Sequence, residues 1–205
     1  MLRRVLFLFL LLFPVAATAG PYDPRLHWRT VDTEHFSFHY TEGEEEVVQR
    51  LVALSEPVYE SLSAKFNAHP WGRTEVVVVD NNDDANGFTT IIPYNWITLR
   101  VVAPTADSSL ADYDDWLREL FVHEYTHVLH LSDTGYPAKA LKFLLGKLVA
   151  PNGLTPGWVT EGIAVYFESD QTGRGRGRSS FTDMLLRTDI LQDQFLHLAV
   201  YQSCA

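Results

Sequence analysis

The hydrophobic and polar residues of this chain follow two periods in turn, a two-residue period typical of strands and a period near 3.6 residues typical of helices. Residues 35–40 alternate and predict a strand, whereas residues 44–66 carry apolar side chains at helical spacing and predict a helix. The β-branched run at 74–80 predicts a strand buried on both faces near the centre of a sheet. Residues 95–103 predict a further strand, so the first half mixes strands with a helix.

The second half of the chain is predicted to be mostly helical, which makes the expected fold class α+β. Residues 120–131 and 138–149 have apolar positions at helical spacing, and residues 181–191 resume that pattern. The polar run 81–87 predicts a turn, and the proline-containing residues 20–34 predict an irregular segment. In the last helix we expect three buried side chains, Met184, Leu185 and Ile190.

The first 19 residues have the three parts of a secretory signal peptide. Arg3 and Arg4 form a basic start, residues 5–13 are apolar, and residues 17–19 supply small side chains for cleavage after Ala19. The apolar stretch is shorter than the ~20 residues that a membrane-spanning helix needs. We therefore expect a periplasmic or secreted protein with no stable membrane insertion after cleavage, and an uncleaved membrane anchor is the alternative.

The composition of residues 20–205 is that of one globular domain. Hydrophobic residues make up 46% of the whole chain, enough for a substantial core. The formal net charge of -10 argues against nucleic acid or an anionic membrane as a partner. The single cysteine, Cys204, offers neither a disulfide nor a nucleophile with a recognisable base.

The predicted helix at 120–131 reads LFVHEYTHVLHL and contains the signature H-E-x-x-H at His123, Glu124 and His127. Residues four apart stand on one face of a helix, so both imidazoles can reach one metal ion while Glu124 lies beside it. Zinc needs a third protein ligand, and a catalytic site keeps its fourth position open for water.

A second motif lies at residues 158–168, which read W-x-x-E-G-x-A-x-Y-x-E. This segment resembles the glutamate helix of gluzincin metallopeptidases, the clan of thermolysin and the zinc aminopeptidases, and the pair of motifs resembles a bacterial peptidase MA-like domain. The resemblance implies that Glu161 is the third ligand of one zinc ion. It also implies a thermolysin-like zincin catalytic domain, in which a small mixed sheet has an edge strand beside the H-E-x-x-H helix and a mostly helical part follows.

Two other residues compete with Glu161 as the third ligand. Asp133 stands where some metzincin-like enzymes carry theirs, but those enzymes need a glycine at the position of His130. His130 itself lies about 10 Å along an unbroken helix from His123, too far for both to bind one ion at about 2 Å. We therefore favour Glu161.

The resemblance and the spacing add residues around the metal. Glu168 lies seven residues after Glu161 on the same helical face, where it could accept a hydrogen bond from a liganding histidine, or could be an exposed glutamate. Tyr166 also matches the motif, although packing explains an aromatic residue there equally well. In the family the strand before the zinc helix is the sheet edge that pairs with extended substrates, which would make a substrate strand, unless it is an ordinary sheet strand, of Asn95, Trp96, Ile97 and Thr98.

These residues predict a zinc metallopeptidase that acts on peptides or proteins, with Glu124 as the general base. The exopeptidase sequence Gly-Ala-Met-Glu-Asn is absent before the zinc helix, which favours an endopeptidase. Two alternatives stay open. One is a zinc-bearing binding or scaffold module without catalysis, and the other is a hydrolase that attacks a different bond.

Two features after the second motif are harder to place. Residues 171–180 alternate glycine and arginine, which is typical of a solvated linker, and the alternative is that the arginines bind a substrate carboxylate or an acidic surface. Related metallopeptidases carry a tyrosine or histidine downstream that stabilises the reaction intermediate, and only His197 and Tyr201 remain here, in no matching motif. We therefore hypothesise that the chain is a truncated or minimal family member.

Overall fold

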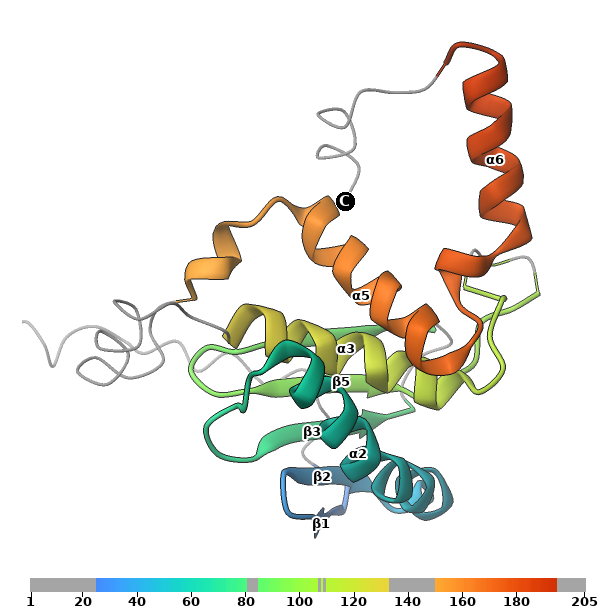
Figure 1. The fold of residues 1–205 in the computed structure, drawn as a ribbon. Helices are drawn as coiled ribbons and strands as arrows, with labels where there is room; N and C mark the ends of the chain where they lie inside the picture. The colour runs from blue at the N-terminus through green and yellow to red at the C-terminus, as the bar shows by residue number, and fades with distance from the viewer. Residues whose placement is uncertain (1–24, 81–84, 107, 109, 133–149, 195–205) are drawn as a thin grey trace, which may run out of the picture.

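A five-stranded mixed sheet and the helices on it form the body of the protein in a computed structural model (Figure 1). The structure describes residues 25–80, 85–106, 108, 110–132 and 150–194. The predicted signal peptide, the predicted helix at 138–149, and Asp133, His197 and Tyr201 lie outside these residues. In chain order the elements are β1 (Trp28–Asp32), β2 (Phe36–Thr41), α2 (Glu45–Phe66), β3 (Thr74–Val79), β4 (Gly87–Thr90), β5 (Trp96–Arg100), α3 (Trp116–Ser132), η1 (Pro151–Leu154), α5 (Gly157–Thr172), η2 (Arg176–Arg178) and α6 (Ser180–Leu191).

The strand order in the sheet is β1-β2-β3-β5-β4. The three inner strands run parallel to one another, and β1 and β4 are added antiparallel at the two edges. The prediction that 74–80 forms a buried central strand is confirmed, because β3 is the middle strand and its four valines are all buried. A strand buried on both faces needs such a continuous apolar run.

Helices α2 and α3 lie over the same face of the sheet, and α5 lies beyond α3, on the side away from the sheet (Figure 1). The core between sheet and helices is rich in aromatic contacts, with Phe36 against Phe121 and Tyr125 at ring-centroid distances of 5.2 Å. Because α3 is enclosed between the sheet and α5, every residue from Phe121 to Leu129 is buried. A helix covered on both sides is expected to be hydrophobic around much of its circumference.

The start of α3 is fixed by Asp115, the residue before it. The Asp115 carboxylate accepts the backbone N–H of Arg118 at 3.3 Å, which satisfies one of the free donors of the first helical turn. Helix α5 ends before Gly173, which has a φ of 76°. That left-handed conformation favours glycine.

The predicted strand at 95–103 is present as β5, but the prediction that it forms the sheet edge is wrong. β5 pairs with β3 on one side and β4 on the other, so its backbone groups are already used. The edge strand beside α3 is β4, which was not predicted as a strand. β1, at the other edge, was likewise missed within the segment expected to be irregular. Pairing between strands is a tertiary contact, and the hydrophobic period of one strand does not encode it.

The predicted helix at 181–191 is present as α6, but its expected burial is wrong. Met184, Leu185 and Ile190 are 51%, 46% and 62% exposed, because α6 stands away from the sheet and the other helices (Figure 1). Helical periodicity identified the element without identifying a surface that would cover it. Among the described residues no helix is both long and apolar enough to cross a membrane.

Candidate metal centre

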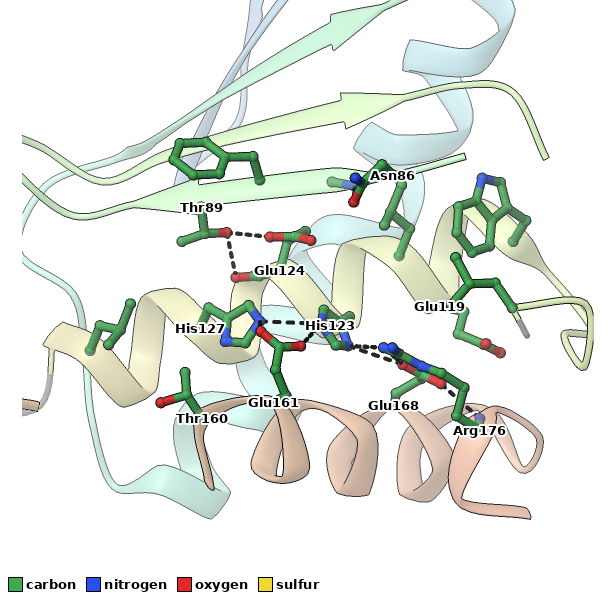
Figure 2. Close-up of a pocket in the computed structure, with 16 residues that line it drawn as sticks. Asn86, Thr89, Glu119, His123, Glu124, His127, Thr160, Glu161, Glu168 and Arg176 are labelled. Carbon is green, nitrogen blue, oxygen red and sulfur yellow. Dashed lines mark hydrogen bonds and ion pairs between the residues drawn. The ribbon is translucent and has the colours of Figure 1, made fainter. Parts of the chain in front are cut away.

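A pocket of about 320 Å³ lies between β4, α3 and α5 (Figure 2). Helix α3 contributes His123, Glu124 and His127, and α5 contributes Glu161 and Glu168. The four-residue step on α3 and the seven-residue step on α5 each place side chains on one helical face. Because these two faces point toward each other, the two motifs of the sequence meet in one place.

The side chains of His123, His127 and Glu161 converge on one point. Nε2 of His123 is 3.1 Å from Nε2 of His127 and 3.4 Å from Oε2 of Glu161, and Nε2 of His127 is 3.5 Å from Oε1 of Glu161. Ligands at 2.0–2.1 Å from a tetrahedral zinc ion lie about 3.3 Å apart. Among the described residues this is the one cluster of three or more His, Cys, Asp or Glu side chains able to hold a metal ion.

The donor atoms themselves fit a cation. Two imidazole nitrogens 3.1 Å apart repel each other through their lone pairs unless a proton or a cation lies between them. The carboxylate of Glu161 adds a negative charge on the same side, with its side chain 52% exposed. Two nitrogens and one carboxylate oxygen are an established ligand set for catalytic zinc.

His123 is oriented by its other ring nitrogen. Nδ1 of His123 lies 3.0 Å from Oε2 of Glu168, so the predicted contact between Glu168 and one of the two motif histidines is present. A proton on Nδ1 that is donated to this carboxylate leaves the lone pair of Nε2 free to face His127 and Glu161. Glu168 is 2% exposed, so the alternative of an exposed glutamate is wrong.

The pKa values of His123 and His127 shift in opposite directions. Burial lowers the pKa of His123, but the contacts with Glu161 and Glu168 raise it by more, to about 9. Burial, and then the neighbouring charge of His123, lower the pKa of His127 to about 4. Near neutral pH and without a metal ion, the pair therefore holds one positive charge, which is the charge that a bound cation would replace.

Glu124 lies beside this cluster and is not part of it. Its Oε2 accepts the hydroxyl hydrogen of Thr89 on β4 at 2.6 Å, and its side chain is buried against the strand. A Cβ atom at Gly87 would lie 2.3 Å from Oε1 of Glu124, so a side chain at this position on β4 would force the carboxylate or the strand to shift. Burial raises the pKa of Glu124 above the usual value of a glutamate, which makes the carboxylate a better proton acceptor.

Several sequence-based candidates lie elsewhere. Tyr166 is 64% exposed and does not line the pocket, because it is two residues from Glu168 on α5 and therefore faces another direction, so its predicted role beside the metal is wrong. Of the proposed substrate strand, none of Asn95, Trp96, Ile97 and Thr98 lines this pocket. His130 is not in the ligand cluster.

The residues of the pocket that were not predicted as part of the site include Gly87, Thr89, Glu119 and Arg176. Glu119 precedes His123 by one helical turn, so helical spacing could have identified it. It is 4% exposed with no partner for Oε2, and burial, followed by the nearby Glu168, raises its pKa to about 8. The glycine–arginine alternation was the only sequence signal for Arg176.

Comparisons with known proteins leave the family open. No family model and no solved structure matches the chain. An uncharacterised protein of Treponema pallidum (strain Nichols) is 29% identical over 148 residues, which are 71% of this chain. The chain spans 12% of that protein's length.

Proposed function

We propose that the protein is an exported zinc-dependent hydrolase of peptide bonds. His123, His127 and Glu161 would hold one zinc ion, and Glu124 would act as the general base. The observation that carries this proposal is the set of ligand-atom distances of 3.1, 3.4 and 3.5 Å, which match a tetrahedral site, next to a buried carboxylate outside the ligand set. The resemblance of both motifs to gluzincins supports the same function.

Zinc, when bound, would lower the pKa of a water molecule toward neutrality and polarise the carbonyl group of the substrate. The residues around the proposed metal site leave it open to the water molecule and to the substrate. Glu161 is half exposed on the pocket side, whereas the two histidines are buried, so solvent and substrate approach from the side of Glu161.

Glu124 would take a proton from the attacking water and pass it to the nitrogen of the leaving amine. Its Oε2 is occupied by the hydroxyl of Thr89, which leaves Oε1 as the atom that accepts the proton. Because Thr89 comes from β4 and the histidines come from α3, the sheet edge fixes the base relative to the proposed metal ligands. Such fixed geometry is a main source of catalytic rate.

The choice of a peptide substrate is supported by β4. This strand is the edge of the described sheet that lies beside α3, and its residues Gly87, Phe88 and Thr89 line the pocket. A free strand edge can pair with an extended peptide through backbone hydrogen bonds. An extended chain bound along β4 would pass Glu124 and Glu161, which suits cleavage within a chain.

Hydrolysis of casein by zinc-loaded protein tests the proposal. We expect the wild type to cleave casein and Glu124→Gln to bind zinc normally but to lose more than about 100-fold of the rate, since a general base contributes about 10² to 10⁴-fold. Activity that survives in Glu124→Gln would eliminate the proposed base. Stoichiometric zinc without hydrolysis in the wild type would favour a scaffold instead.

A further inference from the structure

The glycine–arginine segment that follows α5 is folded against the metal centre. The backbone N–H of Arg176 donates to Oε1 of Glu168 at 2.9 Å, and its guanidinium Nη2 donates to Oε2 at 2.9 Å. One residue thus holds both oxygens of the carboxylate (Figure 2). Charge-assisted hydrogen bonds of this kind are about twice as strong as neutral ones.

The glycines on either side of Arg176 allow this approach. Gly175 has a φ of 93°, and a Cβ atom there would lie 2.8 Å from Oε1 of Glu168. A Cβ atom on Gly177 would lie 2.7 Å from Oγ of Ser169, which accepts the Gly177 N–H at 3.1 Å. The segment therefore lies closer to α5 than residues with side chains would permit.

The contact reaches the ligand histidine through Glu168. Oε2 of Glu168 lies 3.0 Å from Nδ1 of His123, and Nη2 of Arg176 lies 2.8 Å from the same nitrogen. A carboxylate that is 2% exposed is costly to bury without such partners. Any shift of Arg176 would therefore move Glu168 and with it the ring of His123.

We infer that Gly175, Arg176 and Gly177 form a positioning clamp, which fixes the carboxylate of Glu168 and thereby turns Nε2 of His123 toward His127 and Glu161. The inference rests on the proposed metal centre. Arg176 acts through Glu168 and is a positioning residue. The alternation of glycine and arginine is then part of the functional site, where the sequence pattern alone is typical of a linker.

The first test changes the shape of the clamp at constant charge. We expect Gly175→Ala to weaken zinc binding about tenfold, the low end of the effect of losing an outer partner of a metal ligand. The matched control is Gly173→Ala, which also requires a left-handed backbone but has no atom within 4 Å of the added Cβ. Zinc dissociation constants of both variants are measured by competition with a chromophoric chelator.

The second test changes the arginine and keeps its charge. A lysine ammonium cannot reproduce the guanidinium hydrogen bond to Glu168 from the same backbone position, so Arg176→Lys is expected to weaken zinc binding several-fold. Arg174→Lys is the control, since Arg174 is 60% exposed and pairs with Asp112 at 3.6 Å. We expect this control to stay within about twofold of the wild type. If circular dichroism shows that Gly175→Ala does not fold, the comparison of Arg176→Lys with Arg174→Lys tests the clamp.

A spectroscopic measurement separates ligand orientation from general stability. In cobalt-substituted protein, the visible absorption reports the geometry of the ligands, and we expect it to change in Gly175→Ala and Arg176→Lys but not in their controls. Equal zinc affinity and equal spectra in a variant and its control would overturn the clamp. A wild type that binds no zinc would instead overturn the proposed function, so the two failures are distinct.

Discussion

Thr89 on the edge strand donates its hydroxyl hydrogen to Oε2 of Glu124 on α3 at 2.6 Å. The same hydroxyl lies 3.1 Å from the backbone carbonyl oxygen of Glu124. The proposed base is therefore oriented by a residue 35 positions away in sequence, on a strand that was not predicted. Catalysis should depend on this strand even though it contributes no metal ligand.

Removing the Thr89 hydroxyl should slow hydrolysis without affecting metal binding. For Thr89→Val we expect kcat/KM to fall about tenfold, the equivalent of one hydrogen bond to a charged group at about 1.5 kcal/mol. Zinc affinity should stay within twofold or so of the wild type. Thr90→Val is the control, because the Thr90 hydroxyl contacts the carbonyl oxygen of Ile92. Equal rates for the two variants would show that Thr89 does not position the base.

Adding a methyl group at Gly87 should displace the base. The added Cβ would lie 2.3 Å from Oε1 of Glu124, so the carboxylate or the strand must move. We expect Gly87→Ala to lose more than about 100-fold in kcat, since a misplacement of about 1 Å can cost that much. Gly162→Ala on α5 has no atom within 4 Å of its Cβ and should keep the wild-type rate. An active Gly87→Ala would place the base elsewhere.

Glu119 should make the metal-free protein less stable as pH rises. Its pKa is raised to about 8 by burial and by Glu168, from 4.5 in the unfolded chain. The folded state therefore binds more protons than the unfolded state between these values, and stability is lost as pH rises through about 8.

Urea unfolding at pH 5 and pH 9 measures this effect of Glu119. We expect Glu119→Gln to gain roughly 4 kcal/mol relative to the wild type between the two pH values, because the wild type loses about 1.36 kcal/mol for each of the roughly three pH units between pH 5 and the folded-state pKa of about 8. Glu60→Gln, at an exposed position on α2, should show no such gain. If both variants follow the wild-type pH dependence, Glu119 is ionised in the folded state.

Because α6 is exposed, truncating a leucine on α6 should cost less free energy of unfolding than truncating a buried leucine on α3. Leu129 is fully buried in α3, so Leu129→Ala should cost about 2–5 kcal/mol in the free energy of unfolding. Leu185 is 46% exposed on α6, and Leu185→Ala should cost less than about 0.5 kcal/mol. Denaturant unfolding of both variants provides the comparison, and a large cost at Leu185 would mean that α6 is covered.

The sequence was most informative where one element carries its own pattern. β3 and α2 follow from a run of buried valines and from helical spacing, and the contact of Glu168 with His123 follows from a seven-residue step on a helix. β4 was not predicted because its four residues have mixed exposure and show no clear hydrophobic period. The place of Arg176 in the pocket was not predicted, because its partners are brought to it by tertiary packing. Alternating glycines by themselves are typical of a flexible chain.

Zinc titration of the metal-free protein tests the central claim most directly. We expect one zinc ion per chain in the wild type, and a loss of affinity of more than about 100-fold in Glu161→Gln, beyond the 10–100-fold range for outer partners of a ligand. Tyr166→Phe, on the same helix but 64% exposed, should bind as the wild type does. A wild type that binds no zinc, or a Glu161→Gln variant that binds it equally well, would contradict the account.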